Sequence, residues 1–165
     1  QALLKSASDK GYDFKILRAV EDVNDRQKER LVEKIAAKFM DLTGKTIALW
    51  GLAFKPRTDD MREAPAIPII EGLLARGAKV KAYDPAAGPV ARNIFGSRIE
   101  LCDKSYDALA GADALAVVTE WNEFREPDFE RMRSLLKAPV IFDGRNIYSP
   151  EQMRALGFTY LSIGR

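Results

Sequence analysis

After Gly44 the sequence alternates short apolar runs of β type with amphipathic helical segments, and this alternation constrains the possible folds more than any other feature. The predicted strands are Thr46–Trp50, Lys79–Tyr83, Ile99–Cys102, Ala114–Thr119 and Val140–Asp143, with a last strand expected at Phe158–Ile163. The predicted helices are Ala64–Arg76, Gly88–Phe95, Ser105–Ala110, Asp128–Leu136 and Pro150–Leu156. Strands that alternate with helices pair in parallel and are covered on both faces. The sequence therefore predicts an α/β fold with a Rossmann-like, doubly wound and mainly parallel sheet.

A long helical segment precedes this alternation. Apolar residues keep helical spacing over residues 14–41. Residues 1–10 are expected to form a shorter helix that ends at Gly11. Asn24 and Gln27 interrupt the apolar stripe, so they either face solvent or a polar neighbour, or lie in a contact between subunits.

The charge-rich segment Gly51–Pro65 joins the first predicted strand to the first predicted helix of the alternation. It carries three cations and three anions, namely Lys55, Arg57, Arg62, Asp59, Asp60 and Glu63. Ligands of open α/β sheets bind at the carboxyl ends of the strands, and a helix N-terminus at that place favours an anion. The segment is therefore either a phosphate-binding loop or a set of solvated charges that pair with one another.

The second alternative makes specific contacts. Asp60 and Glu63 have the spacing of a capping box at a helix start. The ion pairs it predicts are Lys55 or Arg57 with Asp59, and Arg62 with Asp59 or Glu63.

Another cation follows a later strand end. Gly144 permits a tight turn there, and the Arg145 guanidinium can hold a phosphate through two hydrogen bonds. Alternatively, Arg145 pairs with Asp143 and holds the turn. Asp143 itself is interpreted as structural.

The usual dinucleotide fingerprint is missing. A G-x-G-x-x-G run should follow the first strand, but only Gly51 stands there. Asp84 has the place of a ribose-binding acid, and without the glycines we interpret it as part of a turn or helix start. Trp50 and Trp121 are interpreted as core or domain-contact residues, and Cys102 as a half-buried, inert thiol.

Composition excludes several classes of protein. The absence of histidine excludes Ser-His and Cys-His pairs within the chain, and with a single cysteine it argues against a metal site. A net charge of +2 argues against nucleic-acid binding. No apolar run reaches the roughly 20 residues of a membrane span. One cysteine fits a reducing compartment, so we expect a cytoplasmic protein. The chain begins at Gln1 rather than Met and is expected to be a fragment of a longer protein.

Four stretches of the sequence resemble one known family. They are LRAVEDVNDRQKERLVEKI from Leu17, GLAFKPRTDDMREAP from Gly51, KVKAYDPAA from Lys79 and IFDGRNIY from Ile141. In this order they are similar to the C-terminal part of the UDP-glucose/GDP-mannose dehydrogenase family, in the form of its bacterial members that act on UDP-glucose. Several ordered motifs that together span nearly the whole chain make this resemblance far more specific than one glycine-rich loop.

The resemblance implies two parts and assigns a role to each. Residues 1–43 would be the end of a central helical region that forms a homodimer, and residues 44–165 a domain that binds the UDP part of a nucleotide sugar. The implied substrate-binding residues are Phe54 (through its backbone), Lys55 and Arg145. Arg62 is implied to reach NAD, which an upstream domain would mainly bind. The implied catalytic cysteine also lies upstream, so no catalytic residue is assigned to this chain and Cys102 is not that nucleophile.

The implied function is the UDP-sugar-binding portion of an NAD-dependent dehydrogenase that oxidises UDP-glucose to UDP-glucuronate in two successive steps. The fragment alone is expected to be inactive. One alternative is a dehydrogenase of GDP-mannose or UDP-N-acetylmannosamine. Another is a non-catalytic nucleotide-binding module, which the missing glycine fingerprint favours for the isolated chain.

Overall fold

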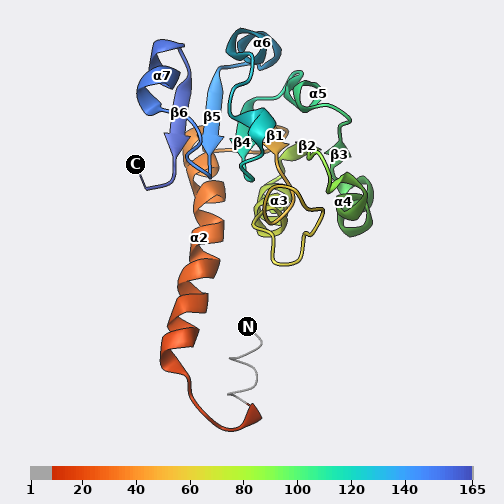
Figure 1. The fold of residues 1–165 in the computed structure, drawn as a ribbon. Coiled ribbons are helices and arrows are strands. Elements are labelled where there is room, and N and C mark those ends of the chain that lie inside the picture. Colours follow the sequence, from red (N-terminus) through yellow and green to blue (C-terminus); the bar gives the residue numbers. More distant parts are fainter. Residues whose placement is uncertain (1–8, 165) are drawn as a thin grey trace.

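The computed structural model describes residues 9–164 and is built around one six-stranded sheet (Figure 1). The strand order is β3-β2-β1-β4-β5-β6, and every neighbouring pair is parallel. The strands are β1 (Thr46–Trp50), β2 (Lys79–Tyr83), β3 (Glu100–Leu101), β4 (Ala114–Val117), β5 (Val140–Asp143) and β6 (Thr159–Ser162). This is the order of the doubly wound dinucleotide-binding fold, with its switch point between β1 and β4. The predicted fold class is therefore confirmed.

Helices connect the strands and flank both faces of the sheet. They are α2 (Lys15–Phe39), α3 (Ala66–Ala75), α4 (Gly88–Phe95), α5 (Ser105–Leu109), α6 (Phe129–Leu135) and α7 (Pro150–Ala155), with 3₁₀ turns η1 (Gly96–Arg98) and η2 (Asn122–Phe124). Across residues 9–164, no helix combines the length and apolar character that crossing a membrane requires.

Two apolar cores lie on opposite faces of the sheet, because successive strand residues point to opposite sides. In β1, Ile47 and Leu49 belong to one core, whereas Ala48 and Trp50 belong to the other. The first core is completed by the end of α2 and by α3 and α4, and the second by α5, α6 and α7. The buried helix residues include Leu31, Ile35, Ile70 and Phe95 in the first core, and Leu109, Met132 and Met153 in the second.

The predicted elements that fall within residues 9–164 are all present, with ends shifted by at most two residues. The largest correction concerns α3, which begins at Ala66 rather than Ala64 and has Pro65 as its N-cap. The predicted capping box of Asp60 and Glu63 is therefore wrong. Proline disfavours the helical conformation for the residue before it, so Ala64 stays outside the helix. The short helix predicted over residues 1–10 lies largely outside the described residues.

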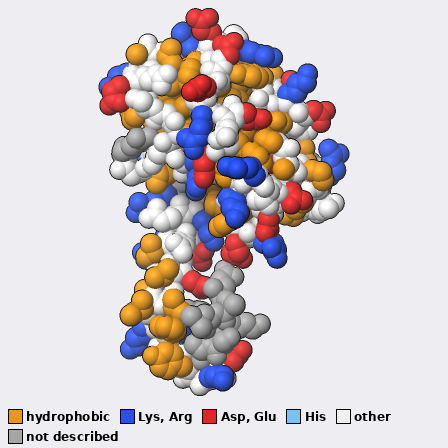
Figure 2. All heavy atoms as spheres, viewed as in Figure 1, with side chains coloured by type: hydrophobic (Ala, Val, Ile, Leu, Met, Phe, Trp, Pro, Cys, Tyr) orange, Lys and Arg blue, Asp and Glu red, His pale blue; other side chains and the backbone are white. Residues whose placement is uncertain are grey.

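The long helix α2 has two different halves. Its last third packs into the first core through Leu31, Val32 and Ile35. Its first half projects from the domain as a stalk (Figure 1), and hydrophobic side chains lie along this stalk (Figure 2). Ile16 and Val20 are 74% and 48% exposed there. Such large apolar side chains in water indicate a contact surface. The division of the chain at residues 43 and 44 stays a prediction.

Candidate functional site

The loops that follow β1, β4 and β5 lie together at the carboxyl edge of the sheet. Phe54, Lys55 and Arg62 are in the loop after β1, and Arg145 is in the loop after β5. Since β4 lies between these two strands, their ends are about 10 Å apart at ordinary strand spacing. All four side chains are exposed. The fold thus brings the predicted substrate-binding residues to one edge.

Asp84, at the end of β2, holds the start of the loop after β1. Its Oδ2 accepts hydrogen bonds from the backbone N–H groups of Leu52 (2.7 Å) and Ala53 (3.0 Å) and from Nε1 of Trp121 (3.1 Å). Its Oδ1 accepts from the next turn of its own segment, through the N–H groups of Ala86 and Ala87 at 2.8 Å each. The predicted turn at Asp84 is confirmed, but the contact with the neighbouring loop is an additional role.

Gly51 and Thr119 close the switch point between β1 and β4. Gly51 adopts a φ of 93°, and a Cβ on it would lie 2.5 Å from the Cβ of Thr119. The hydroxyl of Thr119 also donates a 2.6 Å hydrogen bond to the carbonyl of Ala53. The loops after β1 and β4 are therefore in direct contact at the switch point, where dinucleotide-binding sheets hold a pyrophosphate.

The backbone N–H groups of the first turn after β1 are already used. Those of Leu52 and Ala53 donate to Asp84, and that of Phe54 donates to the carbonyl of Asp60 at 2.9 Å. These three N–H groups are consequently not available to a phosphate at this edge. A backbone contact from Phe54 to a ligand would use its carbonyl oxygen.

Arg62 pairs with Asp60 rather than with Asp59 or Glu63, which corrects the sequence prediction. Its Nη2 lies 2.8 Å from Oδ2 of Asp60, and its backbone N–H donates to Oδ1 of the same carboxylate. A carboxylate readily accepts from the N–H two residues on, which brings the guanidinium with it. Hydrogen bonds from the side chain and the backbone of Arg62 lower the pKa of Asp60 to about 2. Glu63 instead lies 3.8 Å from Lys28.

Lys55 and Arg57 do not pair with Asp59 over residues 9–164, where no ion pair within 4 Å joins them. Arg57 adopts a φ of 64°, so the loop turns at this residue. Lys55 is exposed, and its positive charge contributes to the lowered pKa of Asp60 after the contacts of Arg62. The Lys55 ammonium is thus available to an anionic ligand.

The guanidinium of Arg145 pairs with Glu120. The alternative prediction, a pair of this guanidinium with Asp143, is therefore wrong. Nε of Arg145 donates to Oε2 of Glu120. Partial burial, the largest single cause, would raise the pKa of Glu120, but the hydrogen bond and charge of Arg145, together with a backbone hydrogen bond and the charge of Arg125, outweigh it and lower that pKa. The two terminal nitrogens of the guanidinium have no hydrogen-bond partner within the described part of the chain. A guanidinium held at Nε and open at both Nη atoms suits a phosphate.

Asp143 holds the backbone of the loop that carries Arg145. It is fully buried, and its Oδ1 accepts from the backbone N–H of Arg145 at 2.9 Å. Its Oδ2 accepts from the N–H of Ile147 and from the hydroxyl of Tyr160, both at 2.8 Å. The structural interpretation of Asp143 is therefore consistent with its contacts.

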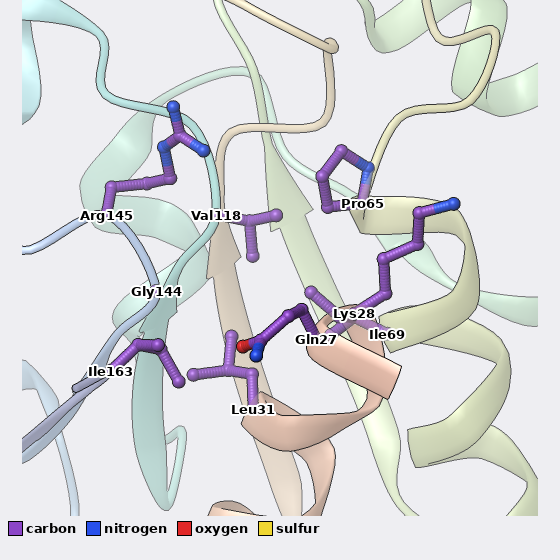
Figure 3. A pocket seen from close by; sticks show the side chains of 9 residues that line it. All are labelled: Gln27, Lys28, Leu31, Pro65, Ile69, Val118, Gly144, Arg145 and Ile163. Atoms are coloured by element: carbon purple, nitrogen blue, oxygen red, sulfur yellow. The ribbon is translucent and has the colours of Figure 1, made fainter. Parts of the chain in front are cut away.

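A pocket of about 190 Å³ lies beside Arg145, between α2 and the ends of β4 and β5 (Figure 3). Arg145 and Lys28 stand on opposite sides of it, and the guanidinium points away from its floor. The floor is apolar and includes Leu31, Ile69 and Val118. No sequence motif predicts this pocket, because its walls come from segments that are far apart in the chain.

The interpretations of the remaining single residues hold. Trp50 is buried, donates from Nε1 to the carbonyl of Ser105 and stacks on Phe124. Cys102 is half-buried, and burial is the main reason that the pKa of its thiol is raised. A thiol that resists ionisation is a poor nucleophile.

Sequence reasoning missed the partners that hold the two loops in place. Neither the pairing of Glu120 with Arg145 nor the hydrogen bond from Thr119 to Ala53 is predicted by the sequence. Strand order is the one signal that could have found them, because the ends of adjacent parallel strands place their following residues side by side.

The fold and edge define a Rossmann-like α/β domain without a dinucleotide fingerprint, and comparison with known proteins identifies its kind. Residues 48–150 match the UDP-binding domain of the UDP-glucose/GDP-mannose dehydrogenase family. The chain is 50% identical over 171 residues to UDP-glucose 6-dehydrogenase of Pseudomonas aeruginosa, covering 100% of this chain and 38% of that one.

Two solved structures share the fold. A UDP-glucose dehydrogenase from Pyrobaculum islandicum has a TM-score of 0.81 at 27% identity and covers 97% of this chain and 34% of its own. UDP-D-ManNAc dehydrogenase from Pyrococcus horikoshii has a TM-score of 0.76 at 27% identity. The match covers 96% of this chain and 36% of the Pyrococcus chain.

The chain therefore belongs to the UDP-glucose/GDP-mannose dehydrogenase family, which confirms the resemblance seen in its sequence. It spans a little over a third of the length of these relatives, between 34% and 38%.

Proposed function

We propose that this chain is the C-terminal, UDP-sugar-binding portion of an NAD-dependent UDP-glucose 6-dehydrogenase. The complete enzyme would oxidise UDP-glucose to UDP-glucuronate in two successive steps. The observation that carries the proposal is the shared sheet edge of Lys55 and Arg145, whose cationic groups have no carboxylate on the atoms that would meet a phosphate. The identity of 50% to a UDP-glucose 6-dehydrogenase over the whole chain supports the choice of sugar nucleotide.

In this proposal the two cations bind the diphosphate and Phe54 contacts the substrate beside them. The ends of β1 and β5 are about 10 Å apart at ordinary strand spacing. The long side chains of Lys55 and Arg145, in the loops that follow these strands, can therefore approach a diphosphate from two sides. Binding energy gained at the UDP end orients the distant sugar for reaction. The chain then contributes to the rate without supplying a reacting group.

NAD does not fit the switch point of this domain. A dinucleotide needs free backbone N–H groups and a glycine-rich approach after β1, whereas Asp84 takes those of Leu52 and Ala53. We therefore place NAD mainly on an upstream domain and derive no step through it. Arg62, whose side chain is 90% exposed, is the residue that we expect to reach NAD across a cleft between this domain and the upstream domain.

The stalk of α2 is the expected homodimer contact. Ile16, Val20 and Val23 are 74%, 48% and 45% exposed, and burying them against a second subunit would remove this apolar surface from water. A homodimer in which α2 pairs with another copy is thus part of the proposal.

A second substrate is kept because the fold is shared with a UDP-D-ManNAc dehydrogenase at a TM-score of 0.76. That structure is 27% identical to this chain, compared with 50% for the Pseudomonas UDP-glucose enzyme. The difference in identity favours UDP-glucose.

The test is to count NADH formed per UDP-glucose consumed by the complete protein. Two NADH per sugar are expected, because two oxidations convert an alcohol to a carboxylate. Turnover with UDP-N-acetylmannosamine or GDP-mannose alone would replace the substrate. No NADH with any nucleotide sugar would overturn the proposal in favour of a non-catalytic binding module.

A further inference from the structure

The contacts of Asp84 reach beyond its own turn. One carboxylate gathers five N–H donors from three segments, and the residue is only 8% exposed. Its two oxygens serve different partners: Oδ1 accepts within its own segment, from Ala86 and Ala87, while Oδ2 accepts from the loops after β1 and β4. We call this Oδ2 cluster of Asp84, Leu52, Ala53 and Trp121 the Asp84 junction.

We propose that Asp84 is a positioning residue for the UDP part of the substrate, acting through the Asp84 junction on Phe54 and Lys55. This inference rests on the proposed function. In dinucleotide-binding sheets the acid at the end of the second strand contacts a ribose. Here it points inward and accepts hydrogen bonds from the backbone of Leu52 and Ala53, the two residues that precede Phe54.

The geometry gives the junction direct control of the loop. Both backbone polar groups of Ala53 are hydrogen-bonded: its N–H donates to Asp84, and its carbonyl accepts from Thr119 at 2.6 Å. Phe54 follows with its own N–H on Asp60. The backbone that leads into Lys55 is therefore fixed residue by residue, which reduces the ordering that a ligand would otherwise have to impose.

A simple role in the turn does not explain the contacts of Oδ2. Oδ1 alone satisfies the N–H groups of Ala86 and Ala87. The charged oxygen that remains accepts three bonds from segments 31 to 37 residues away in sequence. An ionised carboxylate is acceptor-only, so replacing this oxygen by an amide NH₂ turns three attractive contacts into clashes of donors.

The test compares Asp84→Asn with Asp113→Asn in the complete protein. Asparagine caps turns as well as aspartate, so Asp84→Asn can keep its oxygen toward Ala86 and Ala87 and disrupt only the junction. Asp113 is also 8% exposed and also accepts from a backbone N–H, that of Thr46, but at the opposite edge of the sheet. It is a matched control for a lost buried carboxylate.

We expect Asp84→Asn to weaken UDP binding by about 10-fold or more, since hydrogen bonds to a charged group are lost. The KM for UDP-glucose should rise in proportion, the KM for NAD should stay unchanged, and the peptide that spans residues 51–54 should exchange its amide hydrogens faster. Asp113→Asn should leave all of these unchanged. A merely structural role would lower the active fraction and kcat while leaving the KM and the UDP affinity alone, which would overturn the inference.

Trp121→Phe decides the question if Asp84→Asn does not fold. It keeps an aromatic ring, although a smaller one, and removes the indole donor, so a rise of roughly 2- to 5-fold in the Kd for UDP is expected. An unchanged Kd would contradict the inference.

These experiments distinguish a failure of the proposed function from a failure of the role proposed for Asp84. A wild-type protein that binds UDP but oxidises no nucleotide sugar overturns that function, and the UDP affinities still decide the role of Asp84. A wild-type protein that binds no UDP overturns both, while hydrogen exchange at residues 51–54 still shows whether the junction holds the loop.

Discussion

The two edges of the sheet use buried carboxylates differently. At the carboxyl edge Asp84 and Asp143 accept hydrogen bonds mainly from backbone N–H groups of the loops that carry the candidate ligand residues. At the amino edge Asp113 contacts two ammonium groups, with Lys137 at 3.0 Å and Lys45 at 3.7 Å. Acids at one edge thus hold the backbone of loops, whereas the acid at the other edge contacts two ammonium groups in addition to the one backbone N–H of Thr46.

This difference teaches how one fold separates stability from binding. Where a buried carboxylate holds backbone, nearby cations such as Lys55 keep their charge available. Where it binds cations directly, their charge is used within the fold. Substitutions at the two edges should therefore change different measurements.

The largest expected effect is that of Gly51→Ala at the carboxyl edge. The new Cβ would lie 2.5 Å from Thr119 and the backbone has a φ of 93°, so unfolding free energy should fall by about 4 kcal/mol. Gly88→Ala is the control, because no atom lies within 4 Å of its Cβ; it should be neutral or slightly stabilising. Denaturant unfolding of both variants measures this, and equal stabilities would show that the switch point is not closely packed.

Lys55→Ala should come next, with a roughly 100-fold loss of kcat/KM for UDP-glucose in the complete protein, since a charged contact to phosphate is removed. Stability should change little because the side chain is exposed. Lys79→Ala, an exposed lysine at the amino end of β2, should leave kcat/KM unaltered. Steady-state kinetics with both variants checks the prediction, and an unchanged efficiency for Lys55→Ala removes its assigned role.

Asp113→Asn should lower the free energy of unfolding by about 2 kcal/mol without changing the KM for UDP-glucose. Burial alone would raise the pKa of Asp113, but the N–H of Thr46 and the ammonium of Lys137 lower it below 3.8. A lowered pKa stabilises the fold fully above the unfolded pKa, and this stabilisation disappears as the pH falls through the folded pKa. The difference between wild type and variant should therefore shrink below about pH 4. Unfolding curves between pH 2 and pH 7 measure it, and a constant difference would contradict the role of charge.

Arg145→Lys should raise the KM for UDP-glucose about 10-fold, because lysine cannot offer two parallel donors while holding Glu120. Arg98→Lys is its control at the opposite edge, where Arg98 makes two hydrogen bonds to Glu71. Its KM should match that of wild type. Equal KM values for Arg145→Lys and wild type would assign Arg145 to the turn alone.

The smallest expected change in stability is that of Arg62→Ala, because the pair with Asp60 is exposed to water. The KM for NAD should nevertheless rise while the KM for UDP-glucose stays constant. Separate titrations of the two substrates measure this, and the reverse pattern would move Arg62 to the UDP site.

Much of the fold could be predicted from the sequence because its signals are local. Apolar runs such as Thr46–Trp50 gave the strands, and alternation with helices gave a parallel sheet. The start of α3 was predicted two residues early, although Pro65 carried the signal that excludes Ala64 from the helix.

The candidate site was predicted only in part, because its partners are chosen in three dimensions. Motifs gave the positions of Lys55 and Arg145 in the sequence. The pairing of Arg145 with Glu120 spans 25 residues and that of Asp84 with Leu52 spans 32. Several carboxylates compete for each cation, and only the order of the strands decides which one is adjacent.

A crystal structure of the complete protein with UDP would test the central claim most directly. The account predicts diphosphate oxygens about 3 Å from Nζ of Lys55 and from the terminal nitrogens of Arg145, with Glu120 still on Nε and Asp84 still on the backbone of Leu52 and Ala53. A diphosphate that contacts neither cation, or that displaces Asp84 from those N–H groups, would contradict it.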